Sequence, residues 1–273
     1  MHPTVAILGA GAMGEALAGG LLRAGWPASS LTMATRREER RAELEDRTGI
    51  PTTLDAAAAV EGSDVVVVAV KPSDVATLLA QVGSAVTADQ AVLSLVAGVP
   101  CAVYEAVLAD GVPVVRAMPN TPAQISQGVT VIAAGRNADD DAVAAASRVL
   151  GAVGETIVLD ERHLDAVTAV SGTGPAYVFL LAEALTEAAA REGIPRWAAE
   201  RIVVQTIKGS GALMGTAEAG PEKLRAQVTS PGGTTAAAMH VLEGEGFRAL
   251  LEDAVRAAAA RARELGEAAR DES

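Results

Sequence analysis

VAILGAGAMG, at residues 5–14, decides the fold that we expect for this chain. Four apolar residues give a short strand pattern, and the glycines that follow open an amphipathic helical pattern. Glycines in this position supply a tight turn, close approach of the backbone to a pyrophosphate, and close packing of helix on strand. The unpaired N–H groups and positive dipole end of the helix then face the phosphates. This context favours a dinucleotide site over a purely structural turn. The residues expected at that site are Gly9, Ala10, Gly11, Ala12, Met13 and Gly14.

Short apolar runs alternate with amphipathic stretches from Thr4 to about Leu159. Val-rich runs such as residues 65–68 are typical of strands buried on both faces, as in a parallel sheet covered by helices. The pattern therefore predicts an α/β fold with a doubly wound sheet of the Rossmann type. The expected strands are Val5–Leu8, Leu31–Thr35, Val65–Val70, Ala91–Val96, Val112–Ala117, Val129–Ala134 and Thr156–Leu159, and the expected helices include Gly14–Ala24, Arg37–Thr48 and Pro72–Val82.

Strand patterns stop at about Glu161, and the remaining residues give helical patterns separated by Gly and Pro. No linker rich in Ser or charge separates the two parts. We therefore expect a dinucleotide-binding domain over residues 1–160 and an all-helical domain over residues 161–273.

Composition narrows the class of protein. Half of the residues are apolar, but no uninterrupted apolar run approaches the roughly 20 residues of a membrane-spanning helix. The N-terminus lacks the basic and apolar segments of a signal peptide, so we expect a soluble, cytoplasmic protein. The formal charge of -12 argues against nucleic acid as a partner. A single cysteine, Cys101, and three widely spaced histidines weigh against a disulfide or a metal site.

The end of the second strand pattern bears on cofactor choice. An NAD site commonly has Asp or Glu there to bond the ribose hydroxyls, whereas an NADP site has small or basic residues. This strand pattern ends Thr35-Arg36-Arg37, without an acid, and these side chains suit a 2′-phosphate. Alternatively, both arginines lie on a solvated helix start, although cations are slightly unfavourable at a helix N-terminus. The pattern favours NADPH, with NADH still possible.

Further cofactor contacts are expected where other strands end, because ligands bind outside the carboxyl ends of parallel strands. Two such ends are Ala69-Val70-Lys71-Pro72 and the stretch around Ala97. Lys71 either faces the cofactor or substrate, or is a solvated lysine before a helix. Asn120, between two prolines, either meets the nicotinamide amide or caps its own turn.

TSPGGTT, at residues 229–235, precedes a helical pattern and is the most specific stretch of the chain. Its glycines and threonines can present backbone N–H groups and hydroxyls to one small anion, such as a carboxylate. The alternative is an elaborate helix cap with no ligand.

With this loop in view, the chain resembles the pyrroline-5-carboxylate reductases, which make proline by hydride transfer to the C=N bond of a cyclic imino acid. The resemblance covers nearly the whole chain. It rests on residues 228–243, 171–177 (SGTGPAY), 69–72 (AVKP) and 116–122 (RAMPNTP).

The resemblance implies a helical domain that interleaves with that of a partner subunit, an active site at the dimer interface, and dimers that assemble further. It implies that Gly233 and Thr234, with Ser230 nearby, hold the substrate carboxylate. Thr235 would also contact the carboxylate and place its hydroxyl near the imine nitrogen, as a proton donor or for orientation only. Glu161 would bond the ring nitrogen.

Two positions depart from the family pattern: Gln227 stands where many members have Asn or a similar polar residue touching the cofactor, and Ala56 stands where the family has an Asn near the adenosine. A 3-hydroxyacid dehydrogenase would have the same two-part plan, but such enzymes use a lysine in the first long helix of the second domain. Residues 163–191 contain no lysine. A non-catalytic dinucleotide sensor is a further alternative, which would leave residues 230–235 without a chemical task.

Overall fold

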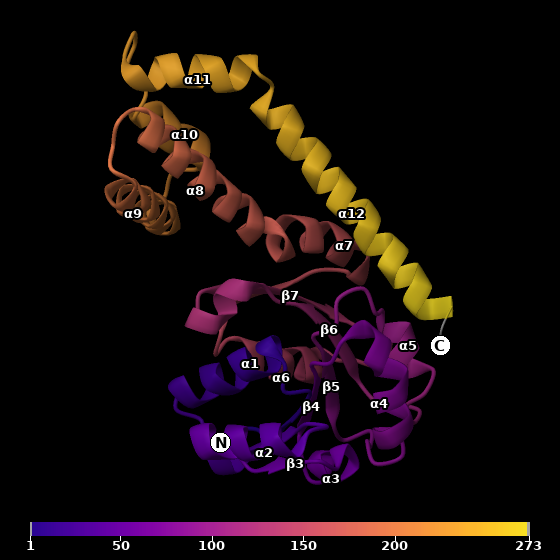
Figure 1. The fold of residues 1–273 in the computed structure, drawn as a ribbon. Helices are drawn as coiled ribbons and strands as arrows, with labels where there is room; N and C mark the ends of the chain where they lie inside the picture. Colours follow the sequence, from indigo (N-terminus) through magenta and orange to yellow (C-terminus); the bar gives the residue numbers. More distant parts are fainter. Residues whose placement is uncertain (1, 272–273) are drawn as a thin grey trace. The chain divides into compact units, whose positions relative to one another are not determined.

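The computed structural model describes residues 2–271. It divides into two compact units (Figure 1). The first, the sheet unit, contains the chain up to Thr173 together with the residues from Ala257 onward. The second, the helical unit, is Gly174–Arg256. The division of the sequence at residue 160 stays a prediction.

The sheet unit holds one eight-stranded sheet in the order β3-β2-β1-β4-β5-β6-β7-β8. All neighbouring strands are parallel except β6 and β7, which run antiparallel. Each expected strand is present, with ends shifted by at most two residues, and the predicted Rossmann-type α/β fold is confirmed. The strands are β1 (Val5–Leu8), β2 (Leu31–Ala34), β3 (Thr52–Thr53), β4 (Val65–Val68), β5 (Ala91–Ser94), β6 (Val114–Met118), β7 (Gly128–Ala134) and β8 (Gly154–Val158).

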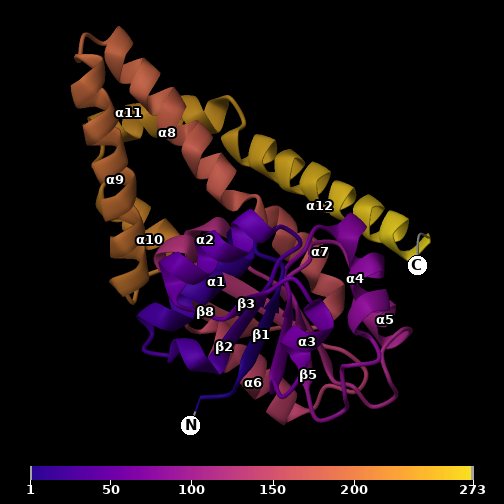
Figure 2. The same cartoon turned by 60° about the horizontal axis from the view of Figure 1, so that its bottom comes forward.

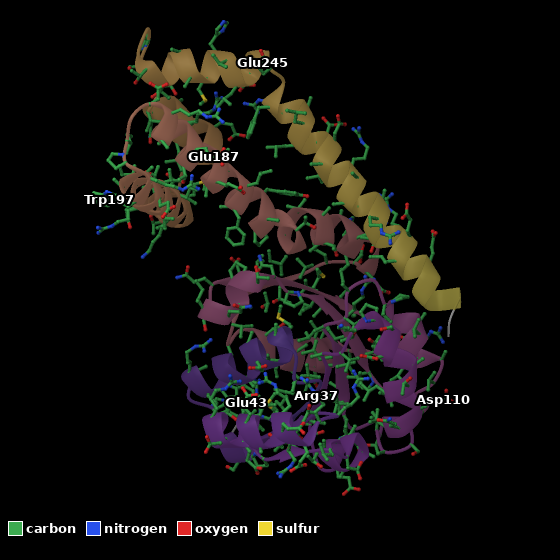
Figure 3. The ribbon with its side chains drawn as sticks, in the orientation of Figure 1. Arg37, Glu43, Asp110, Glu187, Trp197 and Glu245 are labelled. Atoms are coloured by element: carbon green, nitrogen blue, oxygen red, sulfur yellow. The ribbon has the colours of Figure 1, made fainter. Side chains whose placement is uncertain are left out.

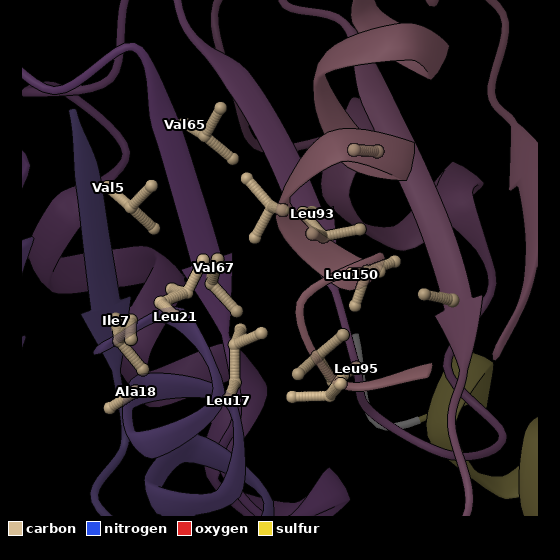
Figure 4. Packing of buried hydrophobic residues seen from close by; sticks show 14 of the residues in the cluster. Val5, Ile7, Leu17, Ala18, Leu21, Val65, Val67, Leu93, Leu95 and Leu150 are labelled. Carbon is tan, nitrogen blue, oxygen red and sulfur yellow. The ribbon is translucent and has the colours of Figure 1, made fainter. Parts of the chain in front are cut away.

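Both faces of the sheet are buried, because successive side chains of a strand point to opposite faces. Val65 and Val67 belong to one apolar cluster, together with side chains of α1, α2 and α6. Val66 and Val68 belong to the other, with side chains of α3, α4 and α5. Figure 4 shows Leu17 and Leu21 of α1 lying against the first of these faces. The layers are therefore helix, sheet, helix.

The helices of the sheet unit follow the strands in alternation (Figure 2). The three expected helices are present, the third beginning with a 3-10 turn at residues 72–74. The helical elements are α1 (Ala12–Arg23), η1 (Ala28–Ser30), α2 (Glu38–Thr48), α3 (Ala56–Val60), η2 (Pro72–Asp74), α4 (Val75–Val82), α5 (Cys101–Glu105), η3 (Thr121–Ile125), α6 (Asp140–Leu150), η4 (Glu161–His163), α7 (Leu164–Val167) and the π-helical turn η5 (Thr168–Gly172).

The helical unit has no strand among its described residues. Its helices α8 and α9 pack side by side. Much of their apolar surface is uncovered in the single chain: the Phe179 side chain of α8 is 66% exposed and that of Trp197, labelled in Figure 3, is 67% exposed. The helices are α8 (Gly174–Arg191), α9 (Arg196–Thr216), α10 (Pro221–Gln227), α11 (Thr234–Gly244) and α12 (Phe247–Asp271), the last of which continues into the sheet unit.

One helical stretch, Glu161–Arg191, is long and apolar enough to cross a membrane by length and composition alone. Small and polar residues interrupt its apolar runs, so it contains no continuous apolar run of about 20 residues. Only 11% of its most apolar window is buried in the single chain.

Candidate active site

A cleft of about 640 Å³ lies in the sheet unit where β1, β2 and β4 end. Ten of the expected cofactor residues line it together, although they come from three separate parts of the sequence. Such a cleft at the carboxyl ends of the strands on both sides of β1 is the usual place for a dinucleotide in this fold. The ten residues are Gly9, Ala10, Gly11, Ala12, Met13, Thr35, Arg36, Ala69, Val70 and Lys71.

The three glycines of the turn have different surroundings. Gly9 has a φ of +113°, and a Cβ there would lie 2.5 Å from the Ala69 carbonyl oxygen, so the turn requires glycine. A Cβ on Gly14 would collide with the Gly9 carbonyl oxygen. At Gly11 nothing lies within 4 Å of the position a Cβ would take. The open side of Gly11, at the N-terminus of α1, fits the close approach of a pyrophosphate.

Arginines surround the end of β2. Arg36 is 80% exposed, and its Nη1 and Nη2 donate to Oδ1 and Oδ2 of Asp74 at 3.2 and 3.0 Å. Arg40 pairs with Glu15 and Glu43. Arg37, labelled in Figure 3, precedes α2 and also lines the cleft. The cleft therefore has a cationic rim at the end where a 2′-phosphate is expected.

Four expected cofactor residues do not line this cleft. Gly14 is buried against the turn, and Pro72 and Ala97 are exposed beyond it. The Asn120 Oδ1 accepts a hydrogen bond from the Val129 N–H at 3.0 Å, which supports its role as a cap of its own turn. Ala56, one of the two departures from the family pattern, does line the cleft.

Glu161 lies in η4, where it is held by the sheet. Its Oε1 accepts from the Cys101 N–H at 2.9 Å and from Arg116 Nη1 at 3.2 Å. The Arg116 side chain, on β6, is only 7% exposed and lies 3.6 Å from an Asp165 carboxylate oxygen. The sequence alone predicts no role for Arg116. An arginine inside an otherwise apolar strand was the available signal, because a buried cation needs anionic partners.

Burial and the neighbouring charges of Glu161 and Glu105 raise the pKa of the Cys101 thiol to about 12. Cys101 is therefore a neutral, inert thiol near neutral pH. Beside it, Tyr104 is fully buried, its hydroxyl lies 2.7 Å from Ser94 Oγ, and burial raises its pKa. Within residues 2–271, no three His, Cys, Asp or Glu side chains gather in a way that could hold a metal ion.

The expected substrate loop belongs to the helical unit and ends at the N-terminus of α11. Gly232 has a φ of +68°, and the Gly233 N–H donates to the Ser230 carbonyl at 3.1 Å. A Cβ on Gly233 would collide with Ser230 Oγ, so the serine hydroxyl lies directly over this glycine. Gly233 is the N-cap residue and no side chain caps α11 among the described residues. The first N–H groups of the helix, at Thr234 and Thr235, are thus available to an anion.

Comparisons with known proteins match both parts of the chain. Residues 161–265 match the family model described as pyrroline-5-carboxylate reductase dimerisation, and residues 4–98 match that of NADP oxidoreductase, coenzyme F420-dependent. A pyrroline-5-carboxylate reductase of Mycobacterium tuberculosis is 43% identical over 284 residues, covering 96% of each chain.

Solved structures agree over the full length. That of a pyrroline-5-carboxylate reductase from Coxiella burnetii superimposes with a TM-score of 0.93 at 34% identity, covering 97% of this chain and 99% of that one. The Plasmodium falciparum pyrroline carboxylate reductase with NADP bound gives a TM-score of 0.85 at 26% identity, covering 97% and 98%.

Proposed function

The chain belongs to the pyrroline-5-carboxylate reductase family, and from this premise we propose that it reduces 1-pyrroline-5-carboxylate to L-proline, the last step of proline biosynthesis. NADPH is the preferred reductant and NADH the alternative. The observation that carries the proposal is the glycine turn, whose open Gly11 faces a cleft lined by Arg36 and Lys71. The two alternatives explain less of the chain. A 3-hydroxyacid dehydrogenase would need a lysine within residues 163–191, which contain none, and a sensor would leave residues 230–235 without a chemical task.

When bound, the dinucleotide would supply the hydride for the imine carbon, and the ring nitrogen would already carry its proton or receive it with the help of water. The chain's own residues bind and orient. The turn at residues 9–13 and the N-terminus of α1 hold the pyrophosphate. The N–H groups of Gly233, Thr234 and Thr235, with the Ser230 hydroxyl, hold the substrate carboxylate. Thr235 Oγ1 orients the ring nitrogen or donates to it, and Glu161 bonds the same nitrogen. Holding the reacting atoms about 3–3.5 Å apart provides much of the rate enhancement.

The direct test is consumption of NADPH and of NADH by the purified full chain with pyrroline-5-carboxylate, with proline measured as product. Turnover that is faster at limiting NADPH than at limiting NADH supports both the reaction and the cofactor preference. Dinucleotide binding without turnover would refute the reductase and favour the sensor alternative.

Thr235→Ala tests the substrate loop. If the hydroxyl takes part in proton transfer, kcat falls by roughly 10² or more, within the range for a positioned acid or base, and Thr235→Ser restores most of it. Thr216→Ala is the matched control, because the Thr216 hydroxyl lies outside the loop and donates to the Ala212 carbonyl of α9. An unchanged kcat in Thr235→Ala removes this hydroxyl from the mechanism.

The proposed enzyme is a homodimer with a shared active site, and its dimers assemble further. Support comes from the dimerisation match over residues 161–265 and from the exposed apolar side chains of α8, α9 and α11. In such a dimer, the second copy of the chain would cover the exposed apolar side chains of Glu161–Arg191. This explains their exposure in the single chain without a membrane contact. We also propose a cytoplasmic location and no nucleic-acid partner.

A further inference from the structure

The Arg36–Asp74 pair brings together two parts of the cofactor cleft that lie 38 residues apart in the sequence. Arg36 follows β2, and Asp74 ends the turn η2 that follows β4. Both side chains line the cleft that contains the glycine turn. The residues that follow β2 contain no acid, but an acidic side chain still lies beside Arg36. It is Asp74, from the segment that follows β4.

The Asp74 carboxylate is directed toward Arg36 and not toward its own helix. Asp74 is the N-cap residue of α4, but within the described structure its side chain makes no capping hydrogen bond. Two other N-cap aspartates of the sheet unit do cap: Asp55 accepts from the N–H groups of Ala57 and Ala58, and Asp139 accepts from that of Ala142. The carboxylate of Asp74 thus stays available at the rim of the cleft.

A ligand can readily replace either partner of the Arg36–Asp74 ion pair. The Arg36 side chain is 80% exposed and that of Asp74 is 27% exposed, and ion pairs this open to water contribute little stability. A 2′-phosphate carries close to two negative charges, attracts a guanidinium bidentately and is repelled by a carboxylate at the same place. A ribose with a free 2′-hydroxyl instead donates hydrogen bonds to a carboxylate.

We propose that Asp74 is a specificity-determining residue for the dinucleotide, acting with Arg36 as an exchangeable pair. Arg36 leaves Asp74 to bind the 2′-phosphate of NADP(H), and Asp74 accepts the ribose hydroxyls of NAD(H). The chain consequently takes both dinucleotides, and Asp74 limits how strongly it prefers NADP(H). This role rests on the proposed function, because it requires a dinucleotide in the cleft.

Asp74→Asn tests this role, since the amide keeps the size of the side chain and removes its charge. Calorimetric titration of the full chain with NADP⁺ and with NAD⁺ gives both dissociation constants without turnover. We expect tighter NADP⁺ binding and weaker NAD⁺ binding, which together raise the preference for NADP⁺ by about tenfold, the factor that corresponds to about 1.4 kcal/mol. Asp74→Ser removes the charge and introduces a hydroxyl that can cap α4, and it is expected to move the preference in the same direction.

The matched control is Asp110→Asn, which removes the same charge from an exposed position of the sheet unit outside the cleft (Figure 3). It should leave both constants unchanged. An equal shift for the two dinucleotides in Asp74→Asn, or none, overturns the proposal while the parent chain still binds both. A folded parent chain that binds neither dinucleotide overturns the proposed function, and this role with it.

Discussion

At the glycine turn, one added methyl group has a different consequence at each position. Gly14→Ala places a Cβ on the Gly9 carbonyl, so α1 must move from the sheet; we expect a loss of about 1–3 kcal/mol in the free energy of unfolding. Gly11→Ala meets only open space, so the ligand-free stability stays within about 0.5 kcal/mol of the parent, while dinucleotide affinity falls because the methyl occupies the pyrophosphate position.

Chemical unfolding without ligand and calorimetric binding measure the two effects separately, and each variant is the control for the other. If Gly11→Ala bound dinucleotide as tightly as the parent, the pyrophosphate would lie elsewhere. A Gly14→Ala variant as stable as the parent would show that the turn tolerates a side chain.

Cys101 gives a prediction on pH. Its pKa is about 12 in the folded chain and near 9 when exposed, so between these values the folded state keeps a proton that the unfolded state has lost. The unfolded state then binds fewer protons, and stability falls as pH rises from about 9 to about 12. Urea unfolding at several pH values should show a steeper decline for the parent than for Cys101→Ala, and the thiol should resist alkylation at pH 8. Equal declines for the two proteins would contradict the prediction.

Among the elements, the link between β6 and the segment η4–α7 depends on one buried cation. Arg116→Met leaves the carboxylates of Glu161 and Asp165 without their partner, and we expect a loss of about 1–3 kcal/mol in the free energy of unfolding, lower than for fully buried pairs because both carboxylates are partly exposed. Arg136→Met is the control: this arginine is 79% exposed and lies 3.9 Å from Glu105, so its removal should cost less than about 0.5 kcal/mol.

Urea unfolding of both variants measures the difference. If Arg116→Met and Arg136→Met were equally stable, the ion pairs of Arg116 with Glu161 and Asp165 would not hold η4 to the sheet. A KM for pyrroline-5-carboxylate that rises in Arg116→Met, measured where the variant is still fully folded, would support a contact of Glu161 with the substrate, because Arg116 helps to fix the position of the Glu161 carboxylate.

How far the sequence predicts the elements depends on what each element's own residues encode. Val-rich runs predict the strands well, because burial on both faces leaves a continuous apolar signal. The two residues of β3 are too few to show a period, and every residue of the short α3 is apolar, so no amphipathic period marks it. The residues of β7 do not themselves indicate that this strand runs antiparallel to β6. This direction follows from the connection at residues 119–127, which is shorter than the dozen or more residues that a parallel crossover needs.

For the whole molecule, the sequence predicts the residues that a motif fixes and misses those that only folding brings together. The lining of the cleft was largely predictable, since strand ends and the glycine turn place it. Asp74 and Arg116 were not, because their partners are distant in the sequence. The substrate loop was recognised from its residues, and the sequence also predicts a separate helical domain around it. The return of the last helix to the sheet unit came from the structure.

Assembly gives the prediction at the largest scale. Phe179→Glu puts a charge on the exposed apolar side of α8, and we expect the dimer to weaken by on the order of 2–4 kcal/mol, as for a central aromatic residue of an interface, with turnover lost at low protein concentration. Dinucleotide binding should survive, because the cleft lies within the sheet unit. Sedimentation velocity measures the assembly, and Phe179→Leu, which stays apolar, is the control. A Phe179→Glu variant that sediments like the parent would place the interface elsewhere.

The last helix of the chain, α12, returns to the sheet unit. This return determines when the sheet unit can finish folding during synthesis. Ala259 and Ala262 of α12 are buried, and Gly98, after β5, approaches Gly266 so closely that a Cβ on Gly266 would lie 2.9 Å from the Gly98 carbonyl oxygen. A ribosome completes residues 174–256 before it reaches Ala257. The nucleotide-binding unit, although it is begun first, therefore receives its final helix only after the whole helical unit has been synthesised, and a chain released at Thr173 lacks the part that covers Gly98.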